Sequence, residues 1–315
     1  MEKIGARVLI VGGGGFIGAW LAKYLVEEDC RVTVVDPFKT LSRINSDLYF
    51  KITKFRMNKL LTNIRLLDSY FDLELLDKTS FDIVFHLAAF PLESKEIEVS
   101  EFQIFNDIPT TFHIAEMFPY ARIVFLSSVF VYGSFEKEIT ERYRTAPETV
   151  YGSSKLISEQ LIRNLTHNWV IIRTTSVYGF GDANLRASQQ FVTRAIYNER
   201  KETAECIVSV NKKAKLQFIY IDDLVDGIVA AGFSDAKNEI YHIAGDQLEP
   251  LENFIVALQR YFPKLKYRLF ESEDRPRRGK MSISKAQILL GWHPKISLES
   301  GVKKYVKIAK AKGFG

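Results

Sequence analysis

The stretch Val8-Leu9-Ile10-Val11-Gly12-Gly13-Gly14-Gly15-Phe16-Ile17-Gly18 decides the fold of this 315-residue chain. An apolar run leads directly into the pattern Gly-x-x-Gly-x-x-Gly, and a helical pattern follows to about Leu25. Glycines permit a tight turn and a close approach to a ligand, and the first N–H groups of a helix attract phosphate. The stretch therefore predicts a strand, a turn and a helix that bind the pyrophosphate of a dinucleotide. The expected contacts are Gly12, Gly15, Phe16, Ile17 and Gly18.

A second apolar run, residues 31–35, ends in Asp36, about 20 residues beyond the first glycine of the turn. A carboxylate in that place accepts hydrogen bonds from the adenosine ribose and repels a 2′-phosphate. Asp36 therefore favours NAD over NADP. The alternative is a glycine-rich turn that binds no ligand, and the acidic residue in register argues against it.

Short apolar segments alternate with helical patterns through the first half of the chain, at residues 8–11, 32–35, 64–67, 83–87, 123–127 and 170–173. This rhythm predicts an α/β fold of the Rossmann type, a doubly wound parallel sheet with helices on both faces. Ligands of such sheets bind beyond the carboxyl ends of the strands.

The alternation of apolar segments and helical patterns ends after about residue 181, which indicates a smaller C-terminal lobe interleaved with the sheet domain. Residues 218–223 predict one more strand ending in acidic residues, a helix follows to 231, and 241–243 resemble a strand. We expect an NAD-binding domain over 1–175 with a returning segment at about 216–245, and a substrate-binding lobe made of 176–215 and 246–315. The polar segment 136–149 is a candidate mobile flap.

The composition is that of a globular protein, with 47% hydrophobic and 26% charged residues. Its apolar runs are shorter than the ~20 residues that span a bilayer, so we expect neither a membrane anchor nor a signal peptide. The two cysteines, Cys30 and Cys206, lack metal-site spacing, which favours a cytoplasmic protein without a metal. The net charge of +5 is dispersed except over 303–312, where a solvated helix face is expected, so nucleic acid is not an expected partner.

Tyr151 and Lys155 are spaced i and i+4, so a phenol and an ammonium share one face of a helix. A phenol has a pKa of about 10, and a nearby cation stabilises its phenolate. Such a pair can remove a proton from an alcohol while hydride leaves the same carbon. A surface contact on a helix is the alternative interpretation.

Ser128 lies at the end of the predicted strand 123–127, where its hydroxyl can bond an oxygen that alternates between alcohol and carbonyl. The alternative is local turn chemistry, because serines often bond nearby backbone at strand ends.

Taken together, these features resemble the extended short-chain dehydrogenase/reductase superfamily, and within it the NAD-dependent epimerase/dehydratase family that acts on nucleotide sugars. The resemblance covers nearly the whole chain. It includes the glycine turn, Asp36, the His-Leu-Ala-Ala run at 86–89, Asn106, Ser128 with Tyr132, the Tyr151/Lys155 pair, and the segments 173–181, 218–223, 275–276 and 289–294.

The resemblance implies roles for individual residues. Tyr151 would be the base, Lys155 would hold the nicotinamide ribose, and Ser128 would bond the reacting oxygen. Further cofactor contacts would come from Asp72, Leu73, Leu87, Ala88, Ala89, Asn106 and Tyr178, with Asp72 and Leu73 at the adenine. Ser176 and Arg275 would bind the substrate, Arg275 at the diphosphate of the nucleotide sugar. Members of the family also form homodimers through two helices, here near 104–118 and 152–165.

Departures from the family pattern bear on the reaction. Ser176, Phe180 and Leu216 replace a usual Asn, Pro and Arg, which alters the nucleotide end of the substrate site. Common 4,6-dehydratases carry Asp-Glu after the serine, whereas this chain has Val129-Phe130, and apolar groups cannot do acid/base work. An NAD-dependent 4-epimerase is therefore the favoured function.

Two alternatives remain open. One is a dehydratase or a C4 oxidase or reductase whose acids have moved elsewhere, to Asp182, Glu93 or His86. The other is an NAD-binding protein without catalytic activity, since fold alone does not fix function.

Overall fold

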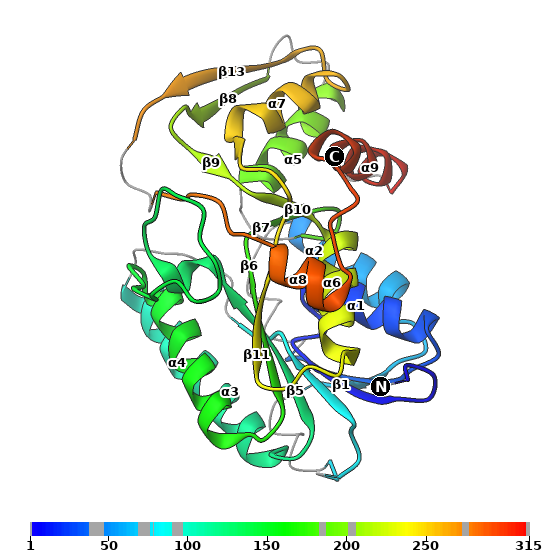
Figure 1. Ribbon diagram of the computed structural model, residues 1–315. Helices are drawn as coiled ribbons and strands as arrows, with labels where there is room; N and C mark the ends of the chain where they lie inside the picture. Colours follow the sequence, from blue (N-terminus) through cyan, green and yellow to red (C-terminus); the bar gives the residue numbers. More distant parts are fainter. Residues whose placement is uncertain are drawn as a thin grey trace.

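The computed structural model describes residues 2–37, 47–68, 76, 77, 79–89, 97–182, 187–200, 206–272 and 277–312. At its centre lies a parallel sheet (Figure 1) whose strands are β1 (Arg7–Val11), β2 (Arg31–Val35), β3 (Arg65–Leu67), β4 (Ile83–His86), β5 (Arg122–Ser128), β6 (Trp169–Thr174) and β11 (Glu239–Ile243). These seven strands are ordered β11-β6-β5-β4-β1-β2-β3. The predicted Rossmann-type sheet is confirmed, and each predicted strand of the first half lies within it.

Helices cover both faces of this sheet. One face carries α1 (Phe16–Glu27) and α6 (Ile221–Phe233), and the other carries α3 (Ile97–Met117) and α4 (Val150–Leu165), as Figure 1 shows. In β1, Val8 and Ile10 pack into the core on one side, whereas Leu9 and Val11 pack into the core on the other. Side chains alternate along a strand, so burial on both faces explains why β1 is apolar almost throughout.

A smaller lobe lies beyond the carboxyl ends of the strands, at the top of Figure 1. Its helices are α5 (Ala187–Arg200), α7 (Leu251–Gln259) and α9 (Leu298–Ala311). Its strands form three pairs, β10 (Phe218–Tyr220) with β7 (Ser176–Tyr178), β12 (Glu249–Pro250) with β9 (Lys215–Leu216), and β13 (Leu265–Phe270) with β8 (Cys206–Asn211). The strand expected over 218–223 is shorter than predicted, because Asp222 and Asp223 already form the first turn of α6.

The remaining elements connect these layers. They are α2 (Asp47–Phe55), the π-helical turn η2 (Arg56–Leu60), the 3-10 turn η4 (Val129–Tyr132) and α8 (Ser284–Leu290). Within the described ranges, no helix is both long and apolar enough to cross a membrane.

Segment 136–149, expected to be a mobile flap, is fastened to the segment that precedes α8. Ile139 N donates to Lys280 O and Ser282 N donates to Ile139 O, at 2.9 and 2.8 Å. Ile139 is buried, and the rings of Tyr132, Phe135 and Tyr143 pack against one another. Paired backbone at Ile139 and the aromatic packing of Tyr143 therefore hold this segment to the rest of the chain, which argues against the predicted mobile flap.

Candidate active site

The glycine turn after β1 lies directly against the backbone that follows β4. Gly12 has a φ of +85°, which side chains other than glycine rarely adopt, and a Cβ there would lie 2.5 Å from Ala88 N. A Cβ on Gly18 would collide with the carbonyl oxygen of Gly12. The turn therefore needs glycine at both positions, and it places segment 87–88 beside the start of α1.

The first turn of α1 is suited to a phosphate. Its N-cap is Gly15, no side chain makes a capping hydrogen bond, and the first turn contains no acidic residue. The amino-terminal N–H groups of a helix carry partial positive charge and lack partners within the helix. This turn and helix start therefore fit the pyrophosphate of NAD.

Asp36 follows β2 and lies beside the glycine turn. Its Oδ2 accepts a hydrogen bond of 2.9 Å from Gly14 N. Burial raises the pKa of the Asp36 carboxyl to about 6, while the Gly14 N–H and the charge of Arg56 act in the opposite direction. The carboxylate is thus held at the edge of the turn, where an adenosine ribose would lie in a dinucleotide fold.

Tyr151 and Lys155 project from the start of α4. Thr149 caps this helix by accepting a hydrogen bond of 3.0 Å from Gly152 N, which fixes Tyr151 in the first turn. Lys155 Nζ lies 5.9 Å from the centroid of the Tyr151 ring and donates to Leu126 O at 2.9 Å. The predicted pairing of phenol and ammonium is present in the structure.

The ammonium of Lys155 is almost entirely buried, and its environment shifts its protonation. Burial lowers its pKa from 10.5 to about 8, and the charges of Asp107 and Glu159 oppose that shift. A cation kept out of water interacts more strongly with a neighbouring phenolate than an exposed one does.

Ser128 ends β5 and caps η4, where its Oγ accepts a long hydrogen bond of 3.4 Å from Phe130 N. The turn then brings Phe130 against the start of α4. The Phe130 ring meets the Tyr151 ring edge-on at 5.7 Å, and a Cβ on Gly152 would lie 2.5 Å from Phe130 O. Ser128, Tyr151 and Lys155 are therefore gathered at the carboxyl end of β5.

A buried polar network lies beneath this set. Arg173 on β6 donates to Glu159 on α4 through Nε and Nη2, at 2.9 and 2.6 Å, and Ser127 Oγ donates to Glu159 at 2.5 Å. Arg173 Nη1 also donates to Tyr132 Oη at 2.7 Å.

The network continues from Tyr132 to His242 and then to the segment before α8. Burial lowers the pKa of His242 to about 4, so the ring is neutral at pH 7. Its Nδ1 lies 2.9 Å from Ser282 O, which can only accept, so Nδ1 carries the proton. Nε2 then accepts from Tyr132 Oη at 2.6 Å. Sequence reasoning missed this network, although Glu159 lies one turn beyond Lys155 and Arg173 interrupts an apolar strand.

The other predicted cofactor contacts lie in different environments. Ala88 is buried against Gly12, and Leu87, Ala89 and Asn106 are partly exposed. Ser176 begins β7 and is also partly exposed. Asp72, Leu73, Glu93 and Arg275 lie outside the described residues.

The side chain of Tyr178 lies in the hydrophobic core. Its ring is buried against Phe218, Tyr220 and Phe254, and its Oη donates to Leu298 O at 3.3 Å. The side chain of Tyr178 therefore belongs to the core between the two lobes, and the cofactor contact expected of this residue stays a prediction.

His86 and Asp182 are poorly placed to be catalytic acids. Burial and the charge of Lys155 lower the pKa of His86 to about 3, and its Nε2 lies 2.8 Å from Thr111 Oγ1. Thr111 itself donates to Asp107 O. Asp182 is buried and interacts with Tyr305 of α9.

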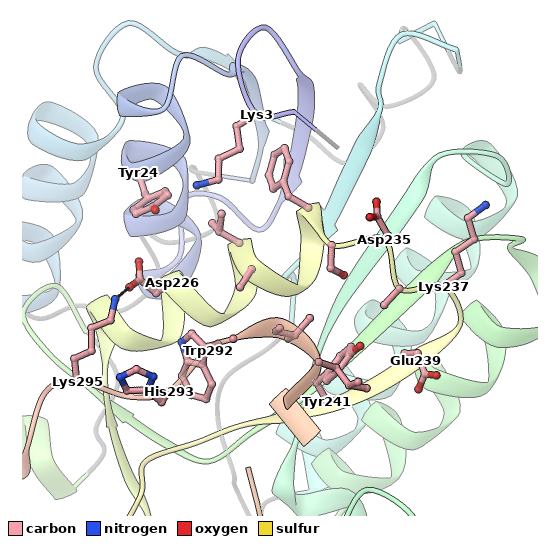
Figure 2. A pocket seen from close by; sticks show the side chains of 18 residues that line it. Lys3, Tyr24, Asp226, Asp235, Lys237, Glu239, Tyr241, Trp292, His293 and Lys295 are labelled. Atoms are coloured by element: carbon pink, nitrogen blue, oxygen red, sulfur yellow. Dashed lines mark hydrogen bonds and ion pairs between the residues drawn. The ribbon is translucent and has the colours of Figure 1, made fainter. Parts of the chain in front are cut away.

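A separate hollow of about 840 Å³ lies between α1, α6, β11 and the segment after α8 (Figure 2). Tyr24, Asp226, Glu239 and Trp292 are among the residues that line it. Because Glu239 begins β11, the hollow opens toward the amino ends of the strands, away from Ser128 and Tyr151. Its lining contains none of the predicted site residues.

A glycine turn at the first strand and a Tyr/Lys pair beside a strand-end serine define a Rossmann-type, dinucleotide-dependent enzyme. The chain belongs to the NAD dependent epimerase/dehydratase family, whose sequence model matches residues 8–244. NAD is the cofactor of this family, and its members include nucleotide-sugar epimerases and dehydratases.

Similar proteins carry several names. An uncharacterized protein of Methanocaldococcus jannaschii is 28% identical, over 95% of this chain and 94% of that protein. UDP-glucuronic acid decarboxylase 1 of Xenopus tropicalis is 26% identical, over 97% of this chain and 72% of its own length. The structure of UDP-glucuronic acid 4-epimerase from Bacillus cereus, with UDP-glucuronic acid and NAD, has a TM-score of 0.83 at 22% identity, covering 97% of this chain and 99% of that one. That likeness shows the fold.

Proposed function

We propose that this protein is an NAD-dependent nucleotide-sugar 4-epimerase in which Tyr151 is the catalytic base. The observation that carries the proposal is the Ser128, Tyr151 and Lys155 set, with Phe130 packed against the phenol at 5.7 Å. Neither Val129 nor Phe130 can move a proton, so the groups gathered here support proton transfer at a single oxygen. Reversible oxidation at C4 needs no more than that.

In the proposed reaction, the Tyr151 phenolate removes the proton from the C4 hydroxyl. The buried Lys155 ammonium stabilises that phenolate, and its bond to Leu126 O holds it in place on α4. NAD, when bound, would supply the hydride acceptor for C4 and the hydride donor for the return step. Ser128 Oγ donates a hydrogen bond to the oxygen as it becomes a carbonyl. Once the 4-keto sugar has rotated, hydride would return to the opposite face of C4 and Tyr151 would give the proton back to the C4 oxygen, which yields the 4-epimer.

The proposed cofactor site uses Gly12, Gly15, Phe16, Ile17 and Gly18 at the pyrophosphate and Asp36 at the adenosine ribose. Tyr151 and Lys155 would line the nicotinamide end, and Asp72 with Leu73 the adenine. Further cofactor contacts would come from Leu87, Ala88, Ala89, Asn106 and Tyr178. Ser128, Ser176 and Arg275 would bind the substrate, a nucleotide sugar.

We further propose that the protein is a homodimer through α3 and α4. Ile157 on α4 and Phe112 on α3 are large apolar side chains that remain 44% and 45% exposed. Ile162, on the same helix, is completely buried in the core against the sheet, whereas Ile157 stays partly exposed. Partly exposed apolar side chains on two adjoining helices are suited to contact with a second copy of the chain.

A dehydratase or decarboxylase is the second candidate, because curated relatives carry those names. The protein should be incubated with UDP-, dTDP-, GDP- and CDP-sugars and the products examined by NMR and mass spectrometry. The proposal predicts a 4-epimer of unchanged mass and no net NADH. Loss of water or of CO₂ would favour the second candidate instead, and bound NAD without any turnover would support a non-catalytic NAD-binding protein.

Tyr151→Phe separates catalysis from binding in the same assay. We expect turnover to fall by about 10²- to 10⁴-fold, while NAD remains bound, because only the acid/base group is removed. An unchanged rate would rule out Tyr151 as the base.

A further inference from the structure

Helices α3 and α4 run in the same direction across one face of the sheet. Strands β4, β5 and β6 are parallel, and each of the two helices returns the chain from the carboxyl end of one strand to the amino end of the next. The helices lie side by side in Figure 1 and pack against each other. Side chains at the same height on the two helices can therefore meet in the contact between them.

Thr111 on α3 marks one such height. Its Oγ1 lies 3.0 Å from Ser158 Oγ on α4 and 2.8 Å from His86 Nε2 at the end of β4. The Thr111 hydroxyl donates its proton to Asp107 O at 2.8 Å, so the His86 ring donates to Thr111 through Nε2. Thr111, Ser158 and His86 are all buried. These bonds fix the register of α3 against α4.

Asp107 and Lys155 lie about one turn nearer the start of each helix. Asp107 precedes Thr111 by four residues and Lys155 precedes Ser158 by three, so each lies on the same helix face as the residue it precedes. The two residues are 8% and 4% exposed. A carboxylate and an ammonium are thus enclosed at the same height between α3 and α4.

Among the residues that the structure describes, Asp107 is the main counter-charge of Lys155. It opposes the fall that burial causes in the pKa of Lys155 more strongly than Glu159 does. Glu159 is itself bound by Arg173 through two hydrogen bonds, and His86 is neutral. The described groups around Lys155 are Tyr151 and Glu159 on α4, Asp107 on α3, His86 on β4, the Phe125 ring and Leu126 carbonyl on β5, and Arg173 on β6 behind Glu159.

We propose that Asp107 is a positioning residue for the Tyr151/Lys155 pair, and that its buried carboxylate keeps Lys155 charged at neutral pH. The proposal rests on the acid/base function proposed above. Asp107 exchanges no proton with the substrate and acts through Lys155, because a nearby anion favours the charged form of an ammonium. Burial strengthens this attraction, since a medium of low polarity screens it only weakly. Without the carboxylate, the charge that stabilises the Tyr151 phenolate would be lost nearer to neutral pH.

The protonation of Lys155 can be measured directly. The full chain is labelled with ¹³C at the lysine Cε atoms and titrated by NMR, and the Lys155 signal is identified by its absence from Lys155→Met. We expect Asp107→Asn to lower the midpoint of this titration by about one pH unit. Asp107→Ser, which is also neutral, should give the same midpoint as Asp107→Asn. Asp226→Asn is the matched control, because it removes a carboxylate that is paired with Lys295 on the other face of the sheet, and it should leave the midpoint unchanged.

The pH profile of kcat/KM separates this role from a structural one. Because the pKa of Lys155 is about 8, a fall of about one pH unit should cost about fivefold in rate at pH 8 and almost nothing at pH 6. Thr111→Val removes hydrogen bonds from the same contact but no charge, so any loss that it causes should be equal at the two pH values.

An unmoved Lys155 midpoint in Asp107→Asn would overturn the proposal, as would a loss of rate in that variant that is equal at pH 6 and pH 8. The proposed function fails in a different way. A midpoint that moves in a protein forming no 4-epimer would contradict the epimerase function but would leave Asp107 as the counter-charge of Lys155.

Discussion

Arg173 on β6 and Glu159 on α4 form a bidentate ion pair, with two hydrogen bonds, that is almost completely buried. Glu159 lies one helical turn beyond Lys155, so the pair ties the helix that carries Tyr151 to the central sheet. Tyr132 and His242 extend the same network to the segment before α8. The position of this helix therefore depends on charged groups that lie beneath it.

Arg173→Met should destabilise the fold by about 3–5 kcal/mol, because it leaves the Glu159 carboxylate buried without its partner. Urea unfolding monitored by circular dichroism measures the change. Glu299→Gln breaks an exposed pair with Arg260 and should cost less than about 1 kcal/mol. Similar losses in the two variants would mean that the buried pair does not anchor α4.

Gly12→Ala should abolish stable NAD binding, because the new Cβ would press on Ala88 N at 2.5 Å. Gly5→Ala provides the matched control, since Gly5 also has a positive φ, +74°, but has no atom within 4 Å of the added Cβ. The control should lose only about 1–2 kcal/mol of stability and retain the cofactor. Mass spectrometry of the nucleotide released from each denatured protein measures the bound NAD. Retention of NAD by Gly12→Ala would show that the glycine turn is not part of the proposed cofactor site.

The rate should depend on the protonation of Lys155. Because its pKa is lowered to about 8, the ammonium is present below pH 8 and is lost as the pH rises through that value. We expect kcat/KM to fall above about pH 8, by up to tenfold per pH unit. A profile that stays flat to pH 10 would show that this charge is not needed.

The same burial means that the charged Lys155 side chain lowers the free energy of unfolding. Between pH 8 and 10.5 the unfolded chain binds a proton that the folded chain has released, so the destabilisation by this group shrinks as the pH rises. At pH 7 Lys155→Met should therefore raise stability by ~1–3 kcal/mol while it abolishes turnover. Lys303→Met, at an exposed position of α9, should change neither. A lower melting temperature for Lys155→Met would contradict the assignment.

Ile157→Glu should convert the proposed dimer into a monomer, because it places a charge in the proposed apolar interface that α3 and α4 form with a second copy. Sedimentation velocity distinguishes the two states. Ile288→Glu on α8 alters a side chain that is 79% exposed and lies away from these helices, so its sedimentation should match that of the wild type. A dimer that survives Ile157→Glu would place the interface elsewhere.

Local signals in the sequence predicted the sheet and the gathering of Ser128, Tyr151 and Lys155. A glycine turn and an i, i+4 pair need only neighbouring residues, so their geometry follows from short-range rules. The network of Glu159, Arg173 and His242 joins distant parts of the chain, and no local pattern indicates which polar residues will meet. The role expected for Tyr178 followed from a family motif, whereas its burial depends on how the two lobes pack.

The most direct test of the central claim follows one hydrogen atom. Nucleotide sugars carrying deuterium at C4 are incubated with the NAD-loaded protein, and the products are located by NMR. The 4-epimerase account predicts a 4-epimer that retains the deuterium at C4, at unchanged mass and without accumulated NADH. Deuterium transferred to C6 with loss of water, or a product that has lost CO₂, would contradict it.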